Sequence, residues 1–253
     1  MKPGKTEYPS VHRGILLAAA AYLQKESHPA AAFYTKEDLR ILADEVVKPD
    51  EKGDRQRGSG YHYYCAVNPK GKANPFVQGD YYPNGRGKKA PSARTMFEEE
   101  YMAAAAAMEQ GSRSRAMAHL GRAAHMLADV YCPPHSCGLT YLTRYAKYHK
   151  QFETIAARKF WADVEAIGEQ AVLQRAAASV QELPQATAFE KIPQQGAGQL
   201  FNSAAQKTAA VLPSVLSKDP SAAENAVQLQ LALAIGATAA LLAAFAEQST
   251  LQL

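Results

Sequence analysis

Apolar residues recur at every third or fourth position along most of this chain, which is the spacing of an amphipathic helix. The strict alternation that predicts strands is nearly absent. The pattern predicts helices over residues 10–24, 35–47, 95–110, 112–130, 141–158 and 159–182, and a last helix capped by Ser221. The predicted fold class is therefore all-α, and we expect residues 1–253 to form a single multi-helix domain.

Several predicted helix ends carry cap signals. Thr35 with Asp38, and Thr95 with Glu98, resemble capping boxes at the starts of two helices. Gly111 is a natural terminator of the helix that Thr95 begins.

Three stretches interrupt the helical pattern. Residues 48–91 are rich in Gly, Pro, Asn and Tyr, and they are too many for an ordinary connection, so we expect this loop to carry function. Residues 184–198 and 213–220 are shorter and rich in turn-forming residues.

Two apolar stretches raise the question of a membrane. Residues 14–23 imitate the apolar part of a signal peptide, but Glu7 and two prolines precede them and no small-residue cleavage site follows. We interpret them as a core helix. Residues 225–246 lack charge, yet Gln228, Gln230 and their many alanines favour a helix buried inside the protein over a transmembrane segment.

Composition narrows the classes of partner. A hydrophobic content of 47% is that of a globular protein with a core. The net charge of +4 favours anionic surfaces only weakly, and no basic tract has interleaved aromatic residues, so nucleic acid is not an expected partner. We expect a monomer.

Cysteine use leaves the cellular compartment open. The three cysteines, Cys65, Cys132 and Cys137, allow at most one disulfide within the chain. The sequence CPPHSC is not a CxxC-like pair, so a disulfide or buried thiols are favoured over metal ligation.

Histidines and carboxylates gather in one short segment. His125 with Asp129, and His149 with Glu153, are pairs four residues apart, a spacing that places both members on one helix face. His135 follows the break at Pro133, where its side chain can turn back toward the preceding helix end. Together these five ligands exceed what one tetrahedral zinc ion needs, and they suit two ions.

A single pair of this kind is more often an exposed ion pair. Here the neighbouring residues Met126, Leu127 and Phe152 are apolar, and charged groups on a buried face need partners or a metal. The repetition of the pair within one segment therefore favours a metal site.

The segment LGRAAHMLADVYCPPH, followed by HKQFE, resembles the bacterial zinc-dependent phospholipase C family. Members of that family carry His-x3-Asp, then x5-His, and later His-x3-Glu. Upstream they carry Pro-Asp and then His-aromatic-aromatic, which match Pro49-Asp50 and His62-Tyr63-Tyr64. The resemblance covers roughly residues 8–160.

The resemblance implies a role for each matched residue. One zinc would be held by His62, His125 and Asp129, and a second by His135, His149 and Glu153. Asp50 would reach between the two ions and act as the general base, with Asp54 as the competing choice.

A third zinc is implied by His12, which matches a family histidine that shares an ion with the amine and carbonyl of the N-terminal residue. That residue is tryptophan in the familiar members. The only tryptophan here is Trp161, so the third site is either completed by a different or processed N-terminus or is only two-thirds formed. His28 and His119 match nothing and are interpreted as surface or packing residues.

The resemblance implies hydrolysis of glycerophospholipids, which releases diacylglycerol and a phosphorylated headgroup. The substrate can be a phospholipid in a membrane surface. Glu51, Tyr61 and Tyr63 are the candidate substrate contacts, and the headgroup stays open because Glu51 and Ser59 replace two aromatic residues of the family's choline cage. The resemblance also implies a secreted protein. The alternatives are a zinc-dependent single-strand nuclease or 3′-nucleotidase, and a non-catalytic helical module stabilised by zinc.

Overall fold

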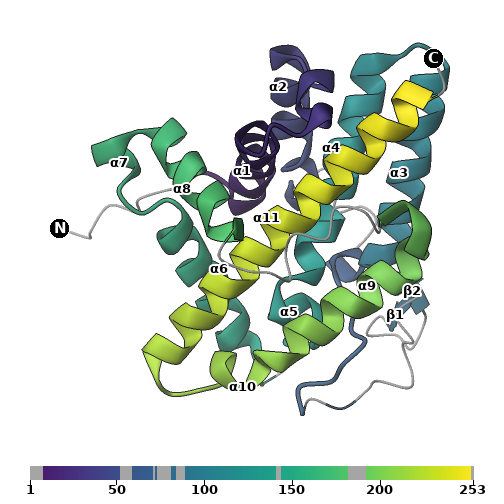
Figure 1. Ribbon diagram of the computed structural model, residues 1–253. Helices are drawn as coiled ribbons and strands as arrows, with labels where there is room; N and C mark the ends of the chain where they lie inside the picture. The colour runs from purple at the N-terminus through teal and green to yellow at the C-terminus, as the bar shows by residue number, and fades with distance from the viewer. Residues whose placement is uncertain are drawn as a thin grey trace.

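Figure 1 shows a molecule built mostly from helices, and this confirms the predicted all-α fold class. The computed structural model describes residues 8–51, 59–70, 72, 81–83, 89–140, 144–181 and 192–251. The α-helices are α1 Val11–Lys25, α2 Lys36–Glu45, α3 Ala93–Glu109, α4 Arg113–Val130, α5 Pro133–Ser136, α6 Ala146–Phe160, α7 Val164–Ile167, α8 Glu169–Gln181, α9 Ile192–Ala210, α10 Leu212–Val215 and α11 Pro220–Leu251. The other elements are the 3-10 helices η1 Pro29–Phe33, η2 Lys48–Asp50 and η4 Ser59–His62, and the antiparallel strands β1 Tyr81–Pro83 and β2 Lys89–Pro91.

The predicted capping box of α2 is confirmed. The Asp38 N–H donates to Thr35 Oγ1 at 3.1 Å, and the Thr35 N–H donates to Asp38 Oδ2 at 2.8 Å.

Two other predicted helix starts were wrong by a few residues. α3 is capped by Ser92, whose Oγ accepts from the Thr95 N–H, so Thr95 already lies inside the helix. α11 begins at Pro220, and Asp219 Oδ1 accepts from the Ser221 N–H at 2.9 Å. In both places a better-placed cap precedes the predicted one, and Pro220 suits the first helical turn because it has no N–H to leave unpaired.

The single helix predicted over residues 159–182 was also wrong. The chain leaves α6 after Phe160 and forms α7 and α8 instead. Asp163 has φ +64° and Gly168 has φ +82°, and neither value belongs to a right-handed helix. Farther on, α9 includes part of the predicted turn-rich stretch, with a non-helical Gly196 at φ +64°.

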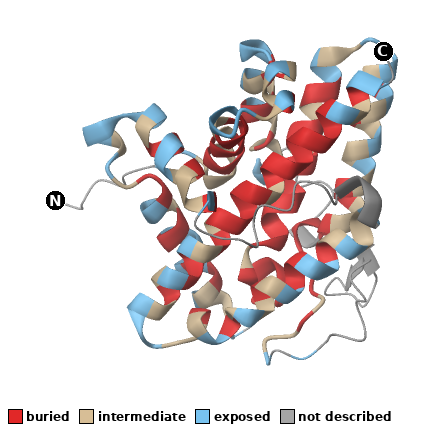
Figure 2. Cartoon of the chain, in the orientation of Figure 1, coloured by how far each residue is buried: buried red, intermediate tan, exposed pale blue. Residues whose placement is uncertain are grey.

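The last helix forms the centre of the core. α11 contacts α1, α4, α6 and α8, and Figure 2 shows buried residues along most of its length. It is long and apolar enough to cross a membrane, and 83% of its most apolar 18-residue window is buried in the protein. That burial is the property expected of the predicted core helix.

A glycine allows α2 and α4 to approach closely. A Cβ added at Gly121 would lie 2.8 Å from the Leu42 carbonyl oxygen, so a side chain there would push the two helices apart. One turn beyond Gly121 along α4, His125 Nδ1 lies 2.7 Å from the Val46 carbonyl at the end of α2. The close approach therefore sets the position of the first site histidine.

Candidate metal centre

α4 places two predicted ligands on one buried face. His125 and Asp129 are 0% and 1% exposed, and His125 Nε2 lies 3.2 Å from Asp129 Oδ2. η4 brings His62 to the same oxygen, with its Nδ1 at 2.8 Å. His62 Nδ1 also lies 3.2 Å from His125 Nε2. One possible ligand atom from each residue lies within 4.8 Å of those of the others, as a shared metal ion would require.

A second group of three forms where α5 meets α6. His135 Nε2 lies 3.2 Å from His149 Nε2, which lies 2.8 Å from Glu153 Oε1. The distance from His135 Nε2 to the same Glu153 oxygen is 3.8 Å. Both histidines are buried, whereas the Glu153 side chain is 46% exposed. The group thus joins a buried nitrogen pair to a carboxylate that reaches solvent.

Backbone carbonyls orient three of the four histidines in these groups. Their Nδ1 atoms face the Val46 oxygen for His125 (2.7 Å), the His62 oxygen for His135 (3.1 Å) and the Leu139 oxygen for His149 (3.0 Å). A carbonyl only accepts, so each Nδ1 donates its proton and Nε2 is left with a lone pair. Such second contacts fix the ring orientation of metal-binding histidines.

Asp129 joins the two groups electrostatically. Its Oδ1 lies 3.2 Å from His135 Nδ1, while its Oδ2 faces His125 and His62. Burial by itself raises the pKa of Asp129, but the charges and hydrogen bonds of His135 and His125 hold that pKa well below its usual range. Burial lowers the pKa of His135, yet the Asp129 and Glu153 carboxylates raise it to about 10. The two carboxylates therefore favour positive charge on the groups between them.

His12 and Asp50 lie beside the first group. The His12 ring stacks on His125 with centroids 3.9 Å apart, and its Nε2 lies 3.5 Å from Asp129 Oδ1 and 3.9 Å from Asp50 Oδ2. Burial and the charge of His125 lower the pKa of His12 to about 4. His12 Nδ1 is buried and has no hydrogen-bond partner among the described residues.

Asp50 itself is open to solvent, with its side chain 57% exposed and Oδ1 3.9 Å from His125 Nε2. The competing Asp54 and the N-terminal residues that would complete a third site lie outside the described residues.

The donor set fits zinc. His135 Nε2 and His149 Nε2 face each other at 3.2 Å, and both rings have their Nδ1 protons directed to carbonyls, so two lone pairs meet when the rings are neutral. In a tetrahedral site with zinc–nitrogen distances of about 2.0–2.1 Å, two ligand nitrogens lie roughly 3.3 Å apart. A zinc ion between them would be bound by both lone pairs.

The three residues predicted to contact substrate lie around the metal centre, but none of them lines the cavity beside it. Glu51 is exposed and pairs with Lys48 at 3.2 Å. Tyr61 is 3% exposed and its hydroxyl donates to the Pro49 carbonyl at 2.7 Å, next to Asp50. The Tyr63 ring is buried, with its centroid 5.0 Å from that of His135. Their contact with substrate stays a prediction, and both tyrosines are placed to support site residues.

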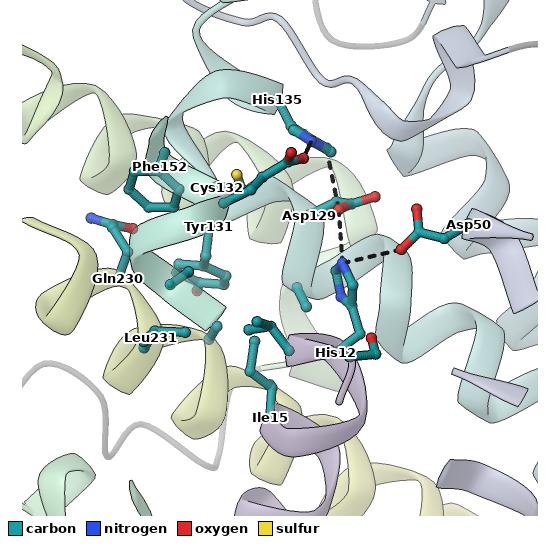
Figure 3. A pocket seen from close by; sticks show the side chains of 16 residues that line it. His12, Ile15, Asp50, Asp129, Tyr131, Cys132, His135, Phe152, Gln230 and Leu231 are labelled. Atoms are coloured by element: carbon teal, nitrogen blue, oxygen red, sulfur yellow. Dashed lines mark ion pairs between the residues drawn. The ribbon is translucent and has the colours of Figure 1, made fainter. Parts of the chain in front are cut away.

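A cavity of about 210 Å³ lies against the cluster (Figure 3). Its polar wall is formed by the site side chains His12, Asp50, Asp129, His135 and Glu153. Its apolar wall comes from α1, the end of α4, α6 and α11, and includes Ile15, Tyr131, Phe152, Leu231 and Ala234.

Sequence reasoning missed the apolar wall, because its residues come from helices far apart in the chain and look like ordinary core residues. It also missed Gln230, which lines the cavity at 2% exposure. The available signal was an amide in the middle of an otherwise apolar helix.

The three cysteines are free thiols, and the two histidines outside the metal groups, His28 and His119, make local contacts. Cys65 and Cys137 are buried free thiols, and Cys132 is a partly buried free thiol in the cavity wall. Burial, together with nearby carboxylates, raises the pKa of Cys132 well above its usual range. His28 caps η1, and His119 lies 2.7 Å from Glu100.

Comparisons with known proteins show which solved structures share this fold. No protein-family model and no curated protein sequence matches this chain. Among solved structures, the alpha-toxin of Clostridium absonum superposes with a TM-score of 0.69 at 17% identity, covering 98% of this chain. An alpha-toxin of Clostridium perfringens from an avian strain gives 0.58 at 15% identity over 97% of this chain. The chain has the alpha-toxin fold.

The alpha-toxin fold agrees with the fold implied by the resemblance to zinc-dependent phospholipases C. The chain spans 65% of the length of each of these two toxin chains. At such low identity the likeness establishes the shared fold, and the chemistry has to be argued from the site.

Proposed function

We propose that this protein is a zinc-dependent phosphodiesterase of the phospholipase C type, which hydrolyses glycerophospholipids to diacylglycerol and a phosphorylated headgroup. The observation that carries the proposal is the meeting of two three-ligand groups and a further exposed carboxylate at one cavity. A site that only stabilises the fold is usually closed by four ligands around one ion. Extra ligands beside an open cavity suit catalysis.

The proposed assignment follows the geometry. The first ion would be held by His62, His125 and Asp129, and the second by His135, His149 and Glu153. A third ion would be held by His12 and Asp50 beside His125, with Asp129 Oδ1 3.5 Å from His12 Nε2. Bound zinc ions would supply polarisation of the phosphate and stabilisation of the negative charge that builds on it.

Asp50 is the proposed general base. Its carboxylate lines the cavity, is accessible to water, and lies 3.9 Å from the nitrogens of both His12 and His125. As a water oxygen bonds to phosphorus, Asp50 takes the proton of that water. The bond from phosphorus to the diacylglycerol oxygen breaks, and that oxygen takes a proton from solvent.

Cavity size supports a lipid that stays partly in its membrane. A volume of about 210 Å³ is below the roughly 300–1,000 Å³ of pockets that enclose a whole drug-sized ligand. It accommodates the phosphate and its nearest groups and leaves the acyl chains outside. The neighbours in structure are called toxins, which act outside the producing cell, so we propose secretion for this protein too.

The test is metal analysis of the purified protein, followed by hydrolysis assays on phospholipid micelles, p-nitrophenyl phosphocholine and single-stranded DNA, each with and without a chelator. We expect bound zinc and phospholipid cleavage that the chelator abolishes and added zinc restores. Cleavage of DNA alone would favour the nuclease alternative. Zinc binding without any hydrolysis would favour a non-catalytic zinc-stabilised module.

A further inference from the structure

A polar side chain in the apolar wall of the cavity has no hydrogen-bond partner among the described residues. Gln230 lies on α11, is 2% exposed, and lines the cavity. Neither its Nε2 nor its Oε1 has a hydrogen-bond partner among the described residues. Leaving a buried amide unpaired is costly, and an apolar side chain of the same size would avoid that cost. The arrangement points to a ligand that pairs with the amide when it enters.

The position of Gln230 indicates which part of the substrate it meets. Figure 3 shows Gln230 near Phe152 on one side of the cavity and Asp50 on the other. In the in-line displacement that metal-assisted phosphodiester hydrolysis uses, the attacking and leaving oxygens lie on opposite sides of the phosphorus. If Asp50 serves the attacking water, the leaving group lies toward Gln230.

The chemistry of this wall agrees with an acylglycerol leaving group. Phe152, Leu231 and Ile15 supply apolar contact area, as the first methylenes of an acyl chain would require. An ester carbonyl only accepts hydrogen bonds, and the Gln230 amide supplies N–H donors. Both polar atoms of the amide are covered in this conformation, so the side chain must rotate to turn Nε2 into the cavity when the substrate enters.

Resting on the proposed phospholipase C activity, we propose that Gln230 is a specificity-determining residue that donates a hydrogen bond from Nε2 to an ester carbonyl of the diacylglycerol leaving group. Its amide would thus distinguish ester-linked from ether-linked lipids, which differ only in the two carbonyls.

The test compares Gln230→Met with the wild-type protein and with Gln228→Met, a matched control at an exposed position of the same helix. Each zinc-loaded protein is assayed for kcat/KM on diacyl and dialkyl phosphatidylcholine in identical mixed micelles, and on p-nitrophenyl phosphocholine, which has no ester carbonyl. We expect the wild-type preference for the diacyl lipid to fall about tenfold in Gln230→Met. All rates of Gln228→Met should stay unchanged, and cleavage of p-nitrophenyl phosphocholine by Gln230→Met shows that the reaction centre of that variant is intact.

A second measurement separates this role from a structural one. Removing an unpaired buried amide should raise the Tm of the metal-free protein by about 2–4 °C in Gln230→Met. A lower Tm with an unchanged diacyl-to-dialkyl ratio would show a structural hydrogen bond and overturn the proposal. Cleavage of p-nitrophenyl phosphocholine with an unchanged ratio overturns the role of Gln230 alone, and absence of any hydrolysis by the wild-type protein overturns the proposed function with it.

Discussion

The helices α4 and α11 both run through the core, but the buried polar side chains of α4 have partners whereas two of those on α11 have none among the described residues. On α4, His125 and Asp129 are surrounded by charged or hydrogen-bonding partners at 2.7–3.5 Å. On α11, Gln230 and Thr238 Oγ1 are buried without partners among the described residues. The first arrangement holds charge in place, while the second leaves hydrogen-bonding capacity free.

The difference follows from the energetics of burial. A lone buried carboxylate would cost so much free energy that it must be paired or coordinate a metal, whereas one unpaired amide costs about 1–3 kcal/mol and a protein tolerates it. We infer that the α4 side of the cavity is organised for cations and the α11 side for a neutral group of the substrate. The predictions below test that division.

The largest effect is expected from Asp129→Ala. Asp129 touches both metal groups, so its loss should reduce the zinc content per chain and lower phosphodiesterase activity by about 10³-fold. Elemental analysis alongside the assay measures both. Normal zinc content and normal rate in this variant would remove the basis for assigning cations to the α4 side.

A fall of about 10²–10⁴-fold in kcat is expected for Asp50→Asn. Because Asp50 is exposed at the cavity rim, the metal content should change much less than in Asp129→Ala. Asp44→Asn, at an exposed position of α2 that does not line the cavity, is the matched control. Equal losses in both variants would argue against a specific base at Asp50.

Chelation should destabilise the wild-type protein. Ions that bind only the folded chain stabilise it by their binding free energy, so removing them should lower the Tm by about 10 °C in differential scanning calorimetry. Gln230→Met should show the same fall in Tm, since we infer that the α11 side of the cavity binds no ion. A Tm that chelator and zinc leave unchanged would contradict the metal assignment.

Asp38 provides the smallest test, because it is a buried carboxylate stabilised by protein partners alone. Burial raises its pKa, but hydrogen bonds from Arg113 and Thr35 outweigh this and lower that pKa below the ordinary value. Asp38→Asn should therefore cost about 1–3 kcal/mol of unfolding free energy at pH 7.

That contribution is complete above the pKa of the unfolded chain and is lost as the pH falls through the lower folded-state pKa. The difference between wild type and Asp38→Asn should thus shrink below about pH 4 in urea titrations. Asp44→Asn, an exposed control, should change stability by less than about 0.5 kcal/mol at either pH. Chelation should not alter the effect of Asp38→Asn.

Much of the fold could be read from the sequence, because helical periodicity and local caps act over a few residues. Thr35 with Asp38 predicted a cap that the structure confirms. The break at Asp163 and the cap at Asp219 escaped prediction, because an aspartate in the left-handed region or a nearby competing cap leaves no periodic signal.

The sequence by itself determined the all-α class and the spacing that brings His125 to Asp129 and His149 to Glu153, since residues four apart on a helix must share a face. The family resemblance implied that Asp50 and His62 join them. Only the tertiary structure decided that carbonyls at Val46 and Leu139 orient the rings, and that Gln230 lines the same cavity. Those contacts join segments far apart in the chain, and their geometry depends on how whole helices pack.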